Sequence, residues 1–162
     1  MHLTIRRATA QDWQQLRTIR LQSLREAPYA FGSTLQHELD FSEETWRQRA
    51  EGNLVFLARG QDQVLGTATG FRDPTTPAGS VRLVAMYVSP SARGTGCAFL
   101  LLDAVAAAAR AEGAGQLVLD VTEVNPVAAR CYSRYGFRPT GHTRPLPHTP
   151  QIAEIEMVLA LG

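Results

Sequence analysis

The sequence predicts a single domain over residues 1–162 of the α+β (mixed α/β) class, with one central sheet and helices on its faces. Three observations indicate this class. The chain of 162 residues has the usual length of one domain. Its content of 44% hydrophobic and 19% charged residues is that of an ordinary globular protein. Antiparallel strand patterns come first and then alternate with helical patterns, and no repeat or linker marks a domain boundary.

The amino-terminal half predicts three strands and two helices. Asp12 is a candidate cap for the first helix, and Pro28 ends it because a residue before proline avoids the helical conformation. The segment 28–41 is expected to be a loop. The motif GQDQ is typical of a hairpin turn between two strands. The predicted elements are a strand at 3–9, helices at 12–27 and 42–51, and strands at 53–60 and 63–72.

The carboxy-terminal half predicts four more strands and two more helices. Gly113 is a natural end for the first of these helices, since glycine favours the position just after a helix. The proline-rich stretch 144–151 is expected to be a loop. The predicted elements are strands at 80–90, 116–122, 137–143 and 152–161, and helices at 96–112 and 125–135. The sheet therefore has about seven strands and about four flanking helices.

Charge and cysteine content exclude several classes of protein. A net charge of +1 gives no basic surface for nucleic acid or an anionic membrane. No apolar run approaches the ~20 residues of a membrane span, and the first residues do not resemble a signal peptide. Cys97 and Cys131 lack metal-ligand spacing, so we expect no metal site and interpret both as packing residues. A reducing cytoplasm is the expected location.

A glycine turn precedes the helix at 96–112 in the segment SPSARGTGCAFLLLD. Strand, glycine-rich turn and helix form an anion site, because the first amides of a helix are unpaired and glycine lets an anion approach. A P-loop is excluded because the turn has no lysine. The dinucleotide motif G-x-G-x-x-G fails at Phe99, although Asp120 mimics its ribose-binding acid. The pattern [QR]-x-x-G-x-[GA] fits residues 93–98 completely.

Two segments resemble one known family. YVSPSARGTGCAFLLL resembles the acetyl-CoA-binding segment of the GNAT superfamily of N-acetyltransferases, and NPVAARCYSRYGF is similar to its N-x-x-A-x-x-x-Y-x-x-x-G-F segment. The resemblance covers roughly residues 81–137 and implies a mostly antiparallel, splayed sheet with acetyl-CoA as cosubstrate. It assigns cofactor contacts to the strand end, the turn and the second motif: Met86, Tyr87, Val88, Arg93, Gly94, Thr95, Gly96, Cys97, Ala98, Asn125 and Ala128.

Tyr132 is the catalytic residue that the resemblance implies. It shares one helix face with Asn125 and Ala128, at spacings of i, i+3 and i+7. A thiol has a pKa of ~8.5 and tyrosine one of ~10, so full proton donation to the departing thiolate is uphill. A hydrogen bond that strengthens as the thiolate forms is the better role. The alternative is that Tyr132 packs in the core like Tyr135 and Phe137.

The acceptor side of the site is less defined. An alkylamine of pKa ~10 must lose a proton before it attacks, but the strand VRLVAMYV has no carboxylate to act as base. Glu38, His37 and Glu123 are more often solvated or capping residues. Arg20 lies within the apolar face of the first helix, where it extends to solvent, pairs with a buried acid, or faces a pocket. The candidate acceptor-binding residues are Arg20, Tyr29, Phe31 and Glu123.

The leading hypothesis is an acetyl-CoA-dependent N-acetyltransferase in which a bound primary amine attacks the thioester directly. The expected partner is a small-molecule or peptide amine, and a homodimer is an open alternative. A non-catalytic acyl-CoA-binding sensor on the same fold is the second hypothesis, and a nicotinamide-binding domain is the third.

Overall fold

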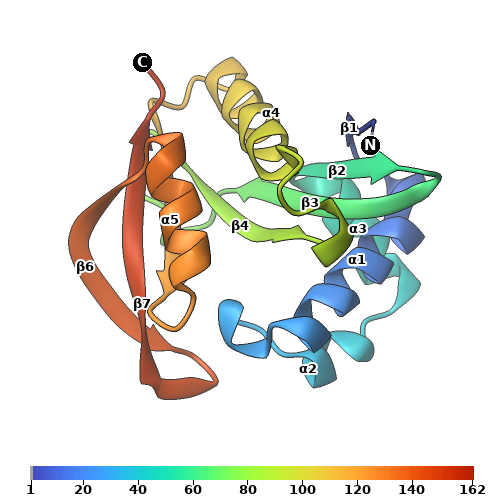
Figure 1. Cartoon of the computed structure of the whole chain (residues 1–162), viewed down its shortest axis with the longest axis horizontal. Coiled ribbons are helices and arrows are strands. Elements are labelled where there is room, and N and C mark those ends of the chain that lie inside the picture. The colour runs from blue at the N-terminus through green and yellow to red at the C-terminus, as the bar shows by residue number, and fades with distance from the viewer. Residues whose placement is uncertain (1) are drawn as a thin grey trace.

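The computed structural model describes residues 2–162, which form one seven-stranded sheet with helices on both faces (Figure 1). The strands are β1 (Thr4–Arg7), β2 (Leu54–Gly60), β3 (Gln63–Phe71), β4 (Ser80–Val88), β5 (Gln116–Thr122), β6 (Arg138–Leu146) and β7 (Thr149–Ala160). The helices are α1 (Trp13–Glu26), α2 (Leu35–Leu39), α3 (Glu43–Gly52), α4 (Cys97–Ala111) and α5 (Pro126–Tyr135). Short 3₁₀ turns lie at η1 (Ala10–Asp12), η2 (Pro28–Ala30) and η3 (Pro90–Ala92).

The centre of the sheet opens between two parallel strands. The strand order is β1-β2-β3-β4-β5-β7-β6, and every neighbouring pair is antiparallel except β4 and β5. Strands β4 and β5 pair only where Ser80–Arg82 lie beside Gln116–Val118. Beyond these positions the two strands diverge, and a bulge at Ala85, where φ is 54°, bends β4 further. The predicted mixed, mostly antiparallel and splayed sheet is confirmed.

Two apolar layers hold the helices on the sheet. Helices α4 and α5 cover one face, where Leu101, Leu102 and Val105 of α4 are fully buried against the strands. Helices α1 and α3 cover part of the other face, with Ile19 and Trp46 at the centre of that layer. Figure 1 shows α4 and α5 on one side of the strands and α1 on the other. Among residues 2–162, no helix has both the length and the apolar character needed to cross a membrane.

Two predicted loops contain regular structure. The segment 28–41 holds η2 and the short helix α2, which raises the number of α-helices from about four to five. The segment 144–151 is the end of β6, a tight turn and the start of β7. Pro145 lies in β6 opposite Ala153. Strand β6 is at the edge of the sheet, where proline is tolerated because one side of the strand needs no backbone donor.

Candidate active site

The turn before α4 presents backbone amides to solvent. Gly94 and Gly96 have φ of 77° and 86°, a left-handed conformation that glycine adopts without strain, and Gly96 caps the helix. A Cβ added at either glycine would meet no atom within 4 Å, so the space in front of the turn is open. Leu100 is the first residue whose amide bonds back, to the Gly96 carbonyl at 3.1 Å. The amides ahead of it therefore offer a site for an anion.

Arg93, in the same turn, is tied to helix α1. Its Nη2 lies 2.5 Å from Glu26 Oε1, and its Nε donates to the Val88 carbonyl at 3.0 Å. Burial raises the pKa of Glu26, but the Tyr87 hydroxyl and Arg93 outweigh burial and lower it. The guanidinium also lies 5.9 Å from the centre of the Tyr87 ring. Half of the Arg93 side chain is exposed, so the guanidinium borders the open face of the turn while it is held by α1.

A small cavity of about 70 Å³ lies where β4 and β5 separate. Of the residues predicted to bind cofactor, Met86, Asn125 and Ala128 line it together with Tyr132. The Asn125 side chain accepts a hydrogen bond from the Ala128 amide at 3.3 Å and so caps α5. The cap leaves the side-chain NH₂ of Asn125 available as a donor. The second motif and the end of β4 thus line the opening of the sheet, whereas the turn residues 93–98 do not line this cavity.

Tyr132 is both a packing residue and a cavity residue. Its ring meets Phe137 edge to face at 5.6 Å between centroids, and the side chain is almost fully buried. Burial raises the pKa of its hydroxyl, and the neighbouring Cys131 adds to the effect. The phenol therefore stays protonated at neutral pH and can act as a hydrogen-bond donor. Tyr132 therefore packs in the core, as the alternative expected, and also lines the cavity, while its catalytic role stays a prediction.

Cys97 and Cys131 are both free thiols. Burial raises the pKa of each, and Arg134 only partly offsets this at Cys131. A thiol must ionise to act as a nucleophile, so neither residue has the environment of a reactive cysteine. The Cys97 side chain packs in the core that α4 forms with the strands.

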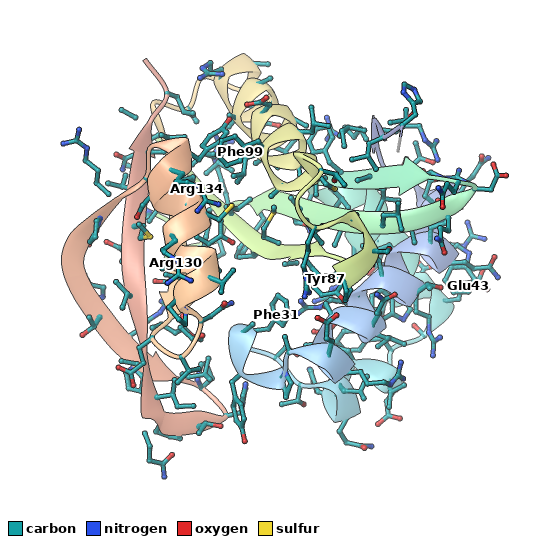
Figure 2. All side chains as sticks on the ribbon, viewed as in Figure 1. Phe31, Glu43, Tyr87, Phe99, Arg130 and Arg134 are labelled. Carbon is teal, nitrogen blue, oxygen red and sulfur yellow. The ribbon has the colours of Figure 1, made fainter. Side chains whose placement is uncertain are left out.

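A larger cavity of about 420 Å³ lies on the other face of the sheet, between the strands and helices α1 and α3. Three residues, Phe31, Val84 and Ala85, line both cavities, so the two spaces meet at the bulged part of β4. Figure 2 shows Phe31 on the segment that follows α1, facing the end of β4 that carries Tyr87. A molecule in each cavity would therefore approach the other across this shared wall.

Arg20 of α1 lines the larger cavity and also pairs with a buried acid. Its Nε and Nη2 each donate to Glu38 at 2.9 Å, and Arg49 Nη1 reaches the same carboxylate at 2.9 Å. Burial raises the pKa of Glu38, but hydrogen bonds and charge from Arg20, aided by Arg49, bring it to about 2. The prediction that Glu38 is a solvated or capping residue is wrong, because its side chain is fully buried.

The other predicted acceptor residues have different surroundings. Phe31 lies 4.9 Å from the Arg20 guanidinium and forms part of the shared wall. Tyr29 is half exposed and stacks on His148 with ring centroids 6.3 Å apart. Glu123 is exposed, and its carboxylate accepts a hydrogen bond from the Ala153 amide at 3.2 Å. Within the described chain, neither Tyr29 nor Glu123 lines the two cavities.

Comparison with known proteins places this geometry in a family. The model of the acetyltransferase (GNAT) family matches residues 13–137, which is most of the chain. The chain belongs to the acetyltransferase (GNAT) family. Streptothricin acetyltransferase of Streptomyces lavendulae is 39% identical over 85 residues, which are 51% of this chain and 43% of that protein. Human N-acetyltransferase 8B is 31% identical over 94 residues, 57% of this chain and 41% of its own length.

These two curated relatives are thus matched over less than half of their own length. Among solved structures, yncA of Salmonella typhimurium with its cofactor acetyl-CoA superposes with a TM-score of 0.80. The superposition covers 100% of this chain and 95% of that one at 21% identity. At this level of identity the likeness establishes the GNAT fold of the chain.

The sequence did not predict two acids of this GNAT chain, Asp120 and Glu154, as residues of the site. Asp120 lines the Tyr132 cavity and accepts hydrogen bonds from Arg82, at 2.9 Å, and from Arg144. Glu154 on β7 is buried beside it, and burial together with the charge of Asp120 raises its pKa. The register of β5 and β7, which pairs Thr122 with Glu154, brings the two acids to one face. Alternating acids in IAEIEM were the only sequence signal for Glu154.

Within residues 2–162, no three His, Cys, Asp or Glu side chains gather as a metal site. The basic partners of Asp120 instead make its surroundings a network of ion pairs.

Proposed function

We propose that this GNAT chain transfers the acetyl group of acetyl-CoA to a primary amine by direct attack in a ternary complex. The observation that supports this most is the pair of cavities that meet at Phe31, Val84 and Ala85. One contains Tyr132 at the opening of the sheet, and the other lies between the strands and helices α1 and α3. An acyl donor and an amine can therefore approach the same point from two sides, which direct transfer requires.

The residues around the turn fit the phosphate end of acetyl-CoA. The free amides from Gly94 to Ala98 and the open space before Gly96 suit a diphosphate. Arg93 would add charge, either by leaving Glu26 or by sharing its guanidinium with both partners. Cys97 and Thr95 take part through their backbone amides only, since the Cys97 side chain is buried and the Thr95 hydroxyl donates to the Ala92 carbonyl.

The arm of the cofactor fits the free edge of β4. From Leu83 onward, the described residues give β4 no strand partner on the β5 side, so the backbone of Met86 and the amide of Val88 remain for the pantetheine amides. The Tyr87 backbone faces β3, and the Val88 carbonyl already accepts from Arg93. Asn125 can donate from its NH₂ group, while the small side chain of Ala128 leaves room. Acetyl-CoA supplies the activated acetyl thioester at this point.

Tyr132 is proposed to donate a hydrogen bond to the departing sulfur. Its raised pKa keeps the phenol neutral, so it stabilises the developing thiolate without first losing its own proton. A neutral donor at the leaving group stabilises the transition state more than the ground state, because the sulfur becomes charged only as the bond breaks.

A thiol-release assay tests this function. The protein is incubated with acetyl-CoA, a thiol reagent and an amine panel that includes streptothricin, free amino acids and a short peptide with a free N-terminus. Thiol release that depends on both protein and amine is the expected result. Binding of acetyl-CoA without release across the whole panel would favour the acyl-CoA sensor. A cytoplasmic location and a homodimer stay predictions.

A further inference from the structure

The larger cavity has the size and walls of a small-molecule site. Its volume of about 420 Å³ lies within the range of ~300–1,000 Å³ that is usual for ligand pockets. Most of its walls are apolar and come from α1, α3 and the strands beneath them. The main apolar wall residues are Leu16, Phe31, Trp46, Val55, Phe71 and Val84. Such walls favour a molecule with an apolar body over a highly polar chain.

Two residues that line this cavity each carry a buried hydrogen-bond donor with no acceptor within residues 2–162. The donors are Nη1 of Arg20 and the indole Nε1 of Trp46. Arg20 is 8% exposed and Trp46 is 1% exposed, so bulk water does not readily satisfy either donor. A buried donor without a partner is costly to the fold, and such groups commonly mark a ligand. The ligand expected here carries acceptors for these donors.

The charge around these donors is positive. Arg20 and Arg49 share the single carboxylate of Glu38, so the three side chains keep one formal positive charge. Glu38 uses Nε and Nη2 of Arg20, which leaves the Nη1 side of the guanidinium for a second acceptor. An anionic acceptor complements this charge, and a carboxylate matches the guanidinium better than a neutral carbonyl does.

Phe31 connects Arg20 with the wall that the larger cavity shares with the Tyr132 cavity. The Arg20 guanidinium is 4.9 Å from the Phe31 ring, and Phe31 with Val84 and Ala85 forms the wall shared with the Tyr132 cavity. A short molecule held at Arg20 therefore places its next atoms at the shared wall. An amine one carbon away from the carboxylate meets this requirement.

We propose that the acceptor is an amino acid with an apolar side chain, held through its carboxylate by Arg20 Nη1 and Trp46 Nε1. This inference rests on the proposed acetyl transfer and specifies its substrate class. The α-amine faces the shared wall and the side chain occupies the apolar part of the cavity. Attack of the neutral amine on the thioester carbonyl forms the amide bond, breaks the carbon–sulfur bond, and releases a proton and the thiolate of CoA.

A panel of matched acceptors tests the assignment. Phenylalanine, leucine and methionine are each compared with their own carboxamides, and kcat/KM is measured by thiol release at saturating acetyl-CoA. We expect at least one of the free acids to exceed its amide by about 10-fold or more, the usual scale for a lost charge-assisted hydrogen bond. The amides have the more easily deprotonated amines, so a preference for the acids cannot come from amine basicity.

Variants connect the preference to the two donors. Trp46→Phe removes the indole N–H while keeping an aromatic ring, and Arg20→Lys keeps the charge but loses the planar set of donors. Each should lower kcat/KM about 10-fold for the acid and by less for the amide, whose carbonyl is a neutral acceptor, and should leave the affinity for acetyl-CoA nearly unchanged. Arg47→Gln is the matched control, because Arg47 of α3 pairs with Glu43 at the surface and lies outside the cavity.

Binding provides a second readout that needs no turnover. The N-acetyl form of the preferred amino acid should raise the midpoint of thermal unfolding of the wild-type chain, and of the Arg47 control, more than that of Trp46→Phe. Equal rates on acids and amides in a chain that binds acetyl-CoA would overturn the assignment and leave acetyl transfer in place. Failure to bind acetyl-CoA at all would overturn the proposed function, and the assignment with it.

Discussion

Tyr132 is the residue on which the proposed chemistry most depends. Replacing it with phenylalanine removes only its hydroxyl group. Tyr132→Phe keeps the contact with Phe137 but removes the donor in the small cavity. We expect kcat to fall on the order of 10- to 100-fold, since one hydrogen bond to a developing charge is lost. The affinity for acetyl-CoA, measured by calorimetry, should stay within about twofold because packing is kept.

Tyr135→Phe is the control for this experiment. The Tyr135 hydroxyl lies on the same helix but bonds Asp103 at 2.5 Å, away from the cavity. Its loss should leave kcat unchanged. A Tyr132→Phe variant as fast as the wild type would contradict the role given to the hydroxyl.

Glu38 makes stability depend on pH in the acidic range. Its pKa of about 2 in the folded chain is below the usual 4.5, so the folded state favours the carboxylate. The stabilisation is complete above pH 4.5 and is lost as the pH falls towards 2, with a total of about 3 kcal/mol. Urea unfolding at a series of pH values should show this loss.

Glu38→Gln provides the comparison. It leaves Arg20 without its buried partner, so the variant should be less stable by about 3–5 kcal/mol at pH 7. It should also lose much of the pH dependence between 4.5 and 2. Parallel pH profiles for the two proteins would show that the carboxylate is not the group responsible.

At the scale of elements, the turn and α4 form the anion site, and glycine conformation makes this testable. Gly96 and Gly113, just outside the two ends of α4, have φ of 86° and 85°, and both have open space around them. Alanine at either position should destabilise the fold by about 1–2 kcal/mol. Only Gly96→Ala should also lower the affinity for acetyl-CoA, by about 10-fold or more, because its methyl group lies where the anion approaches.

The two variants therefore control for each other. Chemical unfolding measures the cost that they share, and calorimetry with acetyl-CoA measures the effect that is specific to Gly96. Similar losses of affinity in both would mean that binding responds to general destabilisation of α4, and the turn would no longer be the site.

Most elements could be predicted from the sequence because their signals are local. The Pro28 boundary and the glycine at 113 depend only on neighbouring residues. Asp12 stands at the start of α1, but the prediction that it caps this helix is wrong, because its carboxylate accepts from Arg6 and the Thr9 amide instead. Helix α2 could not be predicted in this way, because it has only five residues and is held by the ion pair of its Glu38 with Arg20 of α1. The end of β6 was hidden by Pro145, whose acceptance depends on an edge position that only the full strand order reveals.

At the scale of the whole molecule, the site is an opening in the sheet that holds a small cavity, next to a larger cavity between the strands and helices α1 and α3. The motif residues Asn125, Ala128 and Tyr132 could be placed together because one helix carries them. Asp120, Glu154 and Trp46 could not, because strand register and helix packing bring them to the site from distant parts of the chain. Glu123 is exposed, as the solvated alternative expected, and its closeness in sequence to the motif does not bring it to either cavity.

A site with two cavities and no activated thiol predicts direct transfer. Initial-velocity plots for acetyl-CoA and the acceptor should intersect, as they do when both substrates bind before reaction. The mass of the protein should not change after incubation with acetyl-CoA alone, because Cys97 and Cys131 are buried with raised pKa values. Parallel plots together with an acetylated protein would establish a covalent intermediate instead.

Calorimetric titration of the wild-type chain with acetyl-CoA, and separately with acetylpantetheine, tests the central claim most directly. If the amides around Gly96 hold a diphosphate, acetyl-CoA binds saturably with micromolar affinity, and acetylpantetheine, which lacks the diphosphate, binds far more weakly. No saturable heat with millimolar acetyl-CoA, or equal affinity for the two compounds, would contradict the account.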